Sequence, residues 1–208
     1  MGLESAFVIA LLIGVLSFYW IILRSSSKKI FDQYKKLAET FEIELNQPSS
    51  KLKGFIRPEP SVYGQYRGRE ISISVPGKGL QNTRQVESVL KLGHANNSIR
   101  AQLTATGPLG ALRQRDSGKQ SRWKSGDEVF DSAVDVRTNQ GDKLSVLFSA
   151  EQRAWLAETL NQSKATLYMG GGMLAYAKLG LISNESARKE FESVANFLCD
   201  LAESIENN

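Results

Sequence analysis

The apolar positions divide the chain into one long apolar run near its start and a longer stretch of alternating and periodic segments. Residues 6–23 read AFVIALLIGVLSFYWIIL, eighteen residues without a charge. A helix of this length spans about 27 Å, which matches the hydrocarbon core of a bilayer. Tyr19 and Trp20 lie near the end of the run, where aromatic rings favour the lipid–water boundary. The run therefore predicts a transmembrane helix.

A cleaved signal peptide is the competing interpretation of this run. It requires a basic start, a shorter apolar stretch and small residues before the cleavage site. The chain instead begins Met-Gly-Leu-Glu, and the run ends Trp-Ile-Ile-Leu-Arg. A core helix of a soluble domain fits less well, because the run is apolar on every face. We therefore interpret it as an uncleaved signal anchor.

The charges beside the run predict its orientation. No Lys or Arg precedes it, whereas five cations follow closely: Arg24, Lys28, Lys29, Lys35 and Lys36. Because cytoplasmic flanks carry the excess of Lys and Arg, we expect the N-terminus outside and the remaining chain in the cytoplasm of a bacterial cell, at the inner membrane. The lone Cys199 suits a reducing compartment.

The next segment, residues 25–50, predicts a juxtamembrane helix and a linker. Three serines at 25–27 suggest a polar joint. Apolar residues at helical spacing from Ile30 to Phe41 predict a helix, which either continues the membrane helix or restarts after the serines. Pro48 is expected to end this segment.

Alternation of apolar and polar residues predicts strands in the middle of the chain. Residues 61–66 and 69–75 flank an Arg-Gly pair and predict a β-hairpin. Residues 85–92 and 98–106 predict a second strand pair, although the first member also fits a helix.

The following stretch is less regular. Residues 113–125 are polar and basic and predict a flexible loop. Residues 129–137 alternate weakly, which favours a strand, and residues 142–148 fit either a strand or a helical turn.

The last third predicts two helices around a hairpin. Ser149 and Gln152 have the spacing of a capping box at the start of the first helix. Residues 164–169 and 173–179 alternate across three glycines, which predicts the hairpin. The final helix has one apolar stripe, formed by Phe191, Val194, Leu198, Leu201 and Ile205. This stripe covers two heptads, so packing on a sheet is favoured over a coiled coil.

These elements together predict an α+β fold: an N-terminal transmembrane helix followed by an antiparallel sheet with helices on one face. We expect a transmembrane anchor at 1–24, the juxtamembrane helix and linker at 25–50, and one cytoplasmic α+β domain at 51–208.

Composition narrows the functional classes. The 208 residues are 41% hydrophobic and 23% charged, which argues against a wholly disordered chain. The sequence has one Cys and one His. This excludes a disulfide scaffold, a cysteine zinc cluster and a multi-histidine metal site, and leaves few general bases. We therefore expect no cofactor, no metal and no catalytic residues.

The net charge of +4 conceals two blocks of opposite sign. Residues 24–124 hold 19 Lys or Arg against 8 Asp or Glu, and residues 125–208 hold 7 against 13. An anionic leaflet attracts each nearby cation by about 1 kcal/mol. We therefore predict a membrane-surface contact by the basic loop, with a merely solvated loop as the alternative. The contact residues would be Arg113, Arg115, Lys119, Arg122, Trp123 and Lys124. Nucleic acid is disfavoured as a partner, because no nucleic-acid-binding motif accompanies the charge.

An acidic cluster is the best candidate for chemistry in the sequence. Carboxylates that converge can bind a hard cation or act as acid and base, but the calcium-loop pattern is absent. If the segment is a strand, Asp135 would pair with Arg137 in solvent, and this structural interpretation is favoured. The cluster consists of Asp127, Glu128, Asp131 and Asp135.

Three other features are assigned structural roles. Gly170-Gly171-Gly172 lacks the Gly-Lys-Ser/Thr of a phosphate loop and predicts a hairpin turn. His94 is expected to be an exposed turn residue without a serine partner. Cys199 is expected to be an inert buried thiol.

Two short patterns support a resemblance to a known family. The segments YGQYRGR at 63–69 and GDEVFD at 126–131, with the order of elements around them, resemble an uncharacterised family of bacterial single-pass membrane-tethered domains. The resemblance covers roughly residues 30–205 and implies the architecture, with no assigned activity and no catalytic residues. Val134 and Val136 stand where the family pattern suggests one more aromatic residue.

The sequence predicts a non-enzymatic accessory or interaction module at the inner membrane. Its partners would be the lipid bilayer through residues 6–23, an anionic lipid surface and a protein. The alternative is a membrane-bound enzyme or ligand sensor that uses the acidic cluster from Asp127 to Asp135. A third hypothesis places the anchor in a larger membrane complex, with Gly14 in a helix–helix contact.

Overall fold

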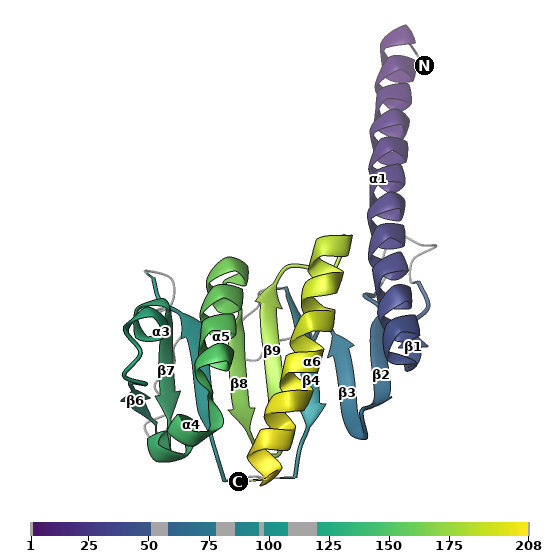
Figure 1. Cartoon of the computed structure of the whole chain (residues 1–208). Helices are drawn as coiled ribbons and strands as arrows, with labels where there is room; N and C mark the ends of the chain where they lie inside the picture. The colour runs from purple at the N-terminus through teal and green to yellow at the C-terminus, as the bar shows by residue number, and fades with distance from the viewer. Residues whose placement is uncertain (1, 51–57, 78–85, 96–97, 108–119, 208) are drawn as a thin grey trace.

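A single long helix connects the apolar run to the folded domain. The computed structural model describes residues 2–50, 58–77, 86–95, 98–107 and 120–207 (Figure 1). Helix α1 (Leu3–Phe41) has 39 residues and runs through the three serines without a break. Of the two alternatives for residues 30–41, continuation of the preceding helix is the one found, and the serines at 25–27 do not interrupt it.

The two halves of α1 have different surroundings. The helix is long and apolar enough to cross a membrane, and none of its most apolar eighteen-residue window is buried inside the molecule. From Ile30 onward one stripe is buried: Ile30, Tyr34, Leu37 and Phe41 are 5%, 0%, 0% and 3% exposed. These positions follow the helical period, so one face of the last three turns belongs to the main core.

The helix ends at Phe41, where the predicted helical spacing of apolar residues ends. Glu42 adopts a left-handed conformation with φ of 55°, and its backbone N–H donates to the carbonyl of Ala38. Strand β1 (Glu44–Asn46) follows directly and lies at one edge of the sheet. Residues 30–46 thus contribute a helix face and an edge strand to the domain that the sequence pattern began at residue 51.

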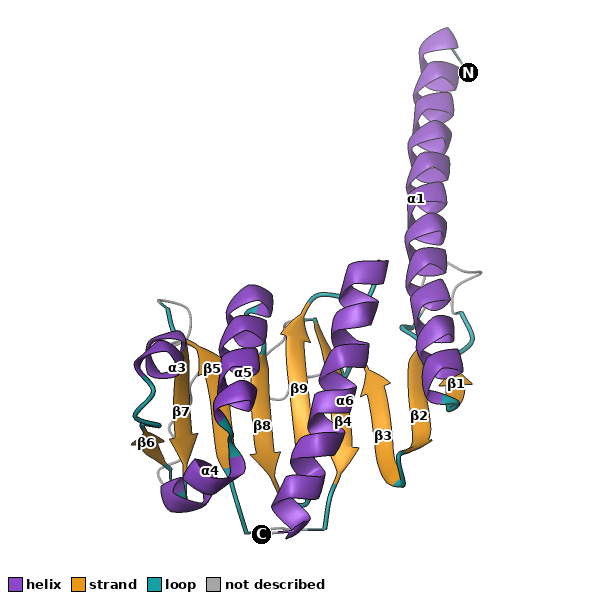
Figure 2. Ribbon diagram, viewed as in Figure 1, coloured by secondary structure: helices purple, strands orange, loops and turns teal. Residues whose placement is uncertain are grey.

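The described residues form one nine-stranded sheet in which neighbouring strands are antiparallel. Helix α5 (Ala150–Ser163), helix α6 (Glu185–Asn207) and the end of α1 cover one face of it (Figure 2). The predicted fold class is therefore confirmed. In spatial order the strands are β1, β2 (Ser61–Tyr66), β3 (Arg69–Ser74), β4 (Glu87–Gly93), β9 (Met173–Leu179), β8 (Thr166–Gly170), β5 (Ala101–Ala105), β7 (Val134–Thr138) and β6 (Ser121–Trp123).

Two of the predicted hairpins are confirmed. In β2–β3 the turn residues Arg67 and Gly68 both have positive φ, 50° and 75°. In β8–β9 the turn residues Gly171 and Gly172 have φ of 64° and 73°. Positive φ at both turn positions matches the right-handed twist of the flanking strands, which explains why glycine occurs in each turn.

The pairing expected between residues 85–92 and 98–106 is wrong. Residues 87–93 and 101–105 are both strands, but β9 and β8 lie between them. The seven residues 94–100 can span about 23 Å, whereas three strand spacings need about 14 Å. The connection is therefore long enough to cross a neighbouring hairpin, and closeness in sequence did not determine the pairing.

The strand predicted at 129–137 is half helix. Residues Glu128–Ala133 form α3, and β7 begins only at Val134. The reason is the cap residue Asp127, whose side chain accepts hydrogen bonds from the amides of Val129 and Phe130. The ambiguous segment at 142–148 is also helical, as α4 (Gly141–Leu147). Of the predicted loop at 113–125, residues 121–123 form β6, and residues up to 119 lie outside the described part.

The two C-terminal helices agree with the sequence pattern. Helix α5 (Ala150–Ser163) begins with the predicted capping box of Ser149 and Gln152. Helix α6 (Glu185–Asn207) buries its whole predicted stripe against the sheet, with no residue of it more than 1% exposed. The end of α1 adds the large side chains Tyr34 and Leu37 to the same core cluster.

This arrangement predicts unequal effects of two leucine substitutions in α1. Leu37→Ala should lower the free energy of unfolding of the domain by about 2–5 kcal/mol, because Leu37 is fully buried. Leu12→Ala should change it by less than about 0.5 kcal/mol, because Leu12 is 55% exposed in the apolar half. Urea unfolding of the full chain in nonionic micelles measures both values. Equal effects would contradict the proposed burial of the end of α1.

Candidate functional site

The four residues of the acidic cluster do not converge. Asp127 caps α3, and its carboxylate lies 3.4 Å from the guanidinium of Arg153 on α5. The hydrogen bond from the amide of Phe130, followed by Arg153, lowers the pKa of Asp127 below its usual range. Glu128 is exposed in the first turn of α3. Both residues therefore serve the start of a helix.

The other two carboxylates have separate structural partners. Asp131 accepts hydrogen bonds from the amides of Ser125 and Gly126, at 2.9 and 3.2 Å, and so closes the loop before α3. Asp135 lies on β7, on the sheet face opposite the buried Val134 and Val136. The ion pairs described for Asp135 are with Arg122 and Arg137, which are not partners of the other three carboxylates in the described part of the chain.

The pairing expected for Asp135 is found, with one difference. Its carboxylate oxygens lie 2.5 Å from Arg122 and 3.9 Å from Arg137. Asp135 is only 8% exposed, so the pair is partly buried and is not the solvent pair that we predicted. Two arginines on neighbouring strands screen this carboxylate, which explains why it is tolerated in the sheet.

The predicted membrane-surface residues are only partly described. Arg113, Arg115 and Lys119 lie outside the described residues. Arg122 is 63% exposed but pairs with Asp135. Trp123 packs on the core in an edge-to-face contact with Phe130, with ring centroids 6.5 Å apart.

Lys124, the last member of that set, donates to the carbonyl oxygen of Asp131 at 3.1 Å. The indole of Trp123 is thus engaged by the domain, while Arg122 and Lys124 each carry a structural contact. The contact of this loop with lipid stays a prediction.

The single histidine is less exposed than its place in a turn suggested. Both ring nitrogens of His94 are buried, and burial lowers the pKa of His94. Cys199 is fully buried, as expected, and burial raises the pKa of its thiol. No group of three or more His, Cys, Asp or Glu that could hold a metal occurs among the described residues.

An ion-pair cluster that sequence reasoning missed joins the β2–β3 turn to the end of α6. We call it the α6 latch: Arg67, Arg69, Asp200, Glu203 and Glu206. Arg67 contacts Asp200 at 2.7 Å and Glu203 at 3.0 Å. Arg69 forms two hydrogen bonds with the carboxylate of Glu206, at 2.7 and 2.6 Å. The signal in the sequence is the spacing of three in the carboxylates, which places them along one side of a helix.

A groove between α5 and α6 was also missed. It has a volume of about 660 Å³ in the half near the start of α5. A smaller hollow of about 440 Å³ continues it along the same two helices, and Trp155 and Ser193 line both. We call the whole feature the α5/α6 groove. The rings of Trp155 and Phe197 bridge the helices in a stack, with centroids 4.1 Å apart and planes 14° from parallel.

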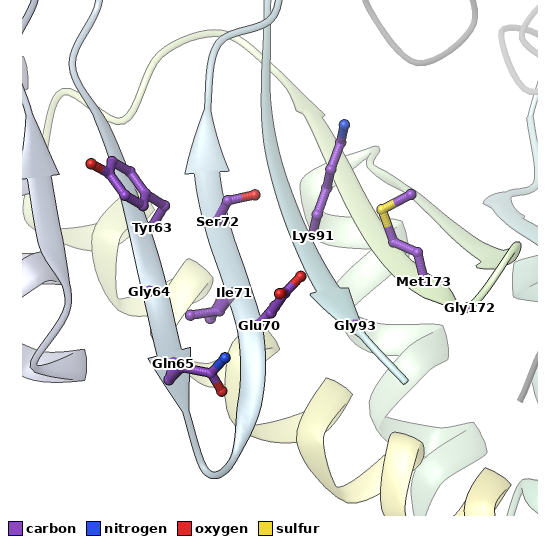
Figure 3. A pocket seen from close by; sticks show the side chains of 10 residues that line it. All are labelled: Tyr63, Gly64, Gln65, Glu70, Ile71, Ser72, Lys91, Gly93, Gly172 and Met173. Atoms are coloured by element: carbon purple, nitrogen blue, oxygen red, sulfur yellow. The ribbon is translucent and has the colours of Figure 1, made fainter. Parts of the chain in front are cut away.

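A second hollow, of about 520 Å³, lies on the strands β2, β3, β4 and the start of β9 (Figure 3). Its side chains alternate with core positions such as Val62, Ile73 and Leu90, so it opens on the face away from the helices. Lys91 and Glu70 supply its charges, and its lining contains no His, Cys or Asp. The hollow therefore offers polar contacts from Ser72, Lys91 and Glu70.

Comparison with known proteins supports the fold alone. Neither the protein-family models nor the curated proteins contain a match to the chain. Among solved structures, the chain is similar to the crystal structure of the mycobacterial trehalose monomycolate transport factor A, TtfA. The identity is 13% and the TM-score 0.59, and the match covers 84% of this chain and 95% of that chain.

The α6 latch predicts a defined acid sensitivity. The pKa of Glu206 is lowered to about 2, first by Arg69 and then by the amide of Ala95. Because the folded pKa lies below the unfolded value of 4.5, Glu206 stabilises the fold above about pH 4.5. This stabilisation is lost as the pH falls from about 4.5 to about 2. Glu206→Gln should therefore flatten the decline of unfolding free energy in that window.

Arg69 supplies the control for this prediction. Arg69→Met should lower the free energy of unfolding nearly as much as Glu206→Gln does. The double variant should lower it little further, because both substitutions remove the same ion pair. The expected coupling is about 1 kcal/mol at neutral pH, since the pair is bidentate but partly exposed. Chemical unfolding between pH 2 and 7 measures it. Fully additive effects would contradict the latch.

Proposed function

We propose that this chain is a single-pass accessory protein of a bacterial inner membrane, whose cytoplasmic α+β domain binds a protein partner and carries no catalytic activity. The observation that carries the proposal is the structure of α1: one continuous helix has an exposed apolar half and a half whose stripe is buried in the domain core. An exposed apolar segment of this length requires a lipid environment.

The helix also fixes the distance between membrane and domain. The buried Ile30 lies six positions after Arg24, the first cation after the apolar run, which corresponds to about 9 Å along a helix. The domain therefore lies close to the headgroups and shares the tilt of the helix. Such rigid placement suits a protein that presents a surface at a set height beside other membrane proteins.

The charges at this junction support the cytoplasmic orientation. Arg24 lies over the ring of Trp20, 5.1 Å from its centroid, and Lys28 and Lys29 are exposed. An aromatic ring and cations at one end of a membrane helix are typical of a cytoplasmic interface. The solved structure of similar fold is named a transport factor. We infer for this chain only an accessory role in a membrane process, not that substrate.

The alternative function loses its geometric basis. An enzyme or ligand sensor at the acidic cluster requires convergence of Asp127, Glu128, Asp131 and Asp135. Asp127 instead caps a helix, Asp131 closes a loop, and Asp135 pairs with arginines on the sheet. The proposal of an interaction module therefore takes precedence.

Membrane topology is the first expected outcome of this proposal. A cysteine introduced as Gly2→Cys should react with an impermeant maleimide added to intact bacterial spheroplasts. Asn207→Cys, at the end of α6, should react only after the membrane is opened. Cys199 provides the background control, because a fully buried thiol should stay unlabelled in both states. Labelling of Asn207→Cys in intact spheroplasts would reverse the orientation.

Partner binding is the second expected outcome. The full chain, extracted from bacterial membranes in a mild detergent, should elute together with a second membrane polypeptide in fixed proportion. Ala10→Arg with Gly14→Arg places two charges in the apolar run, which should release the chain from the membrane and abolish this association. Recovery of the wild-type chain as a monomer alone would contradict the proposal.

A further inference from the structure

The α5/α6 groove has an apolar base that the fold leaves partly uncovered. Trp155 on α5 and Phe197 on α6 are half-buried, although their ring stack is the bridge between the two helices. Val146, at the end of α4, is 70% exposed and lines the same half of the groove. Two half-buried aromatic rings beside an exposed aliphatic residue form the kind of surface that anchors an apolar side chain of a partner.

Small side chains on α6 leave space for a helix in the groove. On α6 the residues at 186 and 193 are both serines, one heptad apart, and both line the groove. Small side chains at heptad spacing let a helix approach closely and run alongside.

The charged residues that line the larger half of the groove are all acidic. Glu151 and Asp200 line the half near the start of α5, and no Lys or Arg lines it. Asp200 shares its charge with Arg67 of the α6 latch, whereas Glu151 is exposed in the first turn of α5. In the other half Lys178 is paired with Glu190. A cationic partner is therefore favoured over an anionic one.

The direction of the groove relates it to the membrane. The axes of α5 and α6 lie roughly parallel to the axis of α1, with α6 running in the same direction as α1 and α5 in the opposite direction (Figure 1). Helix α1 leads to the membrane, so the groove extends from a membrane-proximal end at residues 162 and 186 to a distal end near residue 204. A helix that leaves the bilayer beside α1 can lie along it. Cytoplasmic extensions of membrane helices carry an excess of Lys and Arg.

We propose that the α5/α6 groove binds a cationic amphipathic helix, namely the cytoplasmic extension of a transmembrane helix of a partner membrane protein. Apolar residues on one side of that helix would contact Trp155, Phe197 and Val146. Lysines or arginines beside them would face Glu151 and Asp200. This inference rests on the proposed function as an interaction module and adds the surface and the chemistry of the partner.

The test uses the full chain in neutral phosphatidylcholine nanodiscs and a labelled probe peptide. The probe is a stapled helix of about four turns, with leucines at the i, i+3, i+4 spacing and lysines beside them. A second peptide has glutamate in place of every lysine. Fluorescence anisotropy measures the binding of each peptide, with the signal from empty nanodiscs subtracted.

Two variants alter the groove by different means. Ser193→Trp fills it sterically at an exposed position, so the fold is retained. Glu151→Lys with Asp200→Lys reverses its charge. Both should weaken binding of the lysine probe by about tenfold or more, and the charge-reversed variant should bind the glutamate peptide more tightly than the wild type does.

Two matched controls carry the same chemical changes elsewhere. Ala154→Trp places the same ring at an exposed position of α5 that does not line the groove. Glu70→Lys with Glu128→Lys makes the same change in net charge at two exposed positions that do not line the groove. Both controls should bind the lysine probe as the wild type does. Thermal unfolding of all variants verifies that each is folded.

Three results would overturn the groove assignment. These are absence of binding to the wild type, equal weakening by groove and control variants, and a dimer of the chain that Ser193→Trp dissociates. The last result would identify a second copy as the occupant. A different outcome is that the chain still co-elutes with a membrane polypeptide although the groove variants bind the lysine probe as tightly as the wild type does. In that case the proposed function stands and only the groove assignment is rejected.

Discussion

The burial of the last three turns of α1 in the domain core is the interaction on which the rest of the structure depends. Ile30, Tyr34, Leu37 and Phe41 are removed from water by the sheet and by α6, while the preceding turns of the same helix expose an apolar surface. One helix therefore carries both a candidate membrane span and part of the domain core. Because the backbone hydrogen bonds continue between them, the domain has little freedom to rotate relative to the anchor.

The segment YGQYRGR, which carried the family resemblance, has a structural role around this helix. Gly64 lies where a Cβ would come within 2.8 Å of Ile43, directly after α1. The ring of Tyr66 contacts Phe41 with centroids 4.7 Å apart, and its hydroxyl donates to Asn196 of α6. Arg67 and Arg69 then hold the end of α6 through the latch. The pattern therefore joins the first and last helices to one hairpin, which gives it a structural role.

Local signals in the sequence predicted most helices and strands, whereas the order of the strands in the sheet and the candidate site depend on tertiary contacts. The apolar run, the Arg-Gly turn, the capping box of Ser149 and the stripe of α6 depend on neighbouring residues, and each was identified. The insertion of β8 and β9 between β4 and β5 depends on contacts distant in sequence. Asp127 was assigned to an acidic cluster although it caps α3, because alternation alone does not distinguish a strand from a capped short helix. The α5/α6 groove was missed since a hollow between helices leaves no periodic signal.

The continuity of α1 between lipid and core is the central claim, and one distance tests it most directly. Nitroxide labels at Val15→Cys and Lys35→Cys, with the chain in nanodiscs, lie twenty residues apart on exposed positions on either side of the three serines. Buried Cys199 stays unlabelled. A continuous helix predicts a narrow distance distribution centred near about 30 Å in double electron–electron resonance. A broad distribution at shorter distances would show a hinge at the serines and contradict the account.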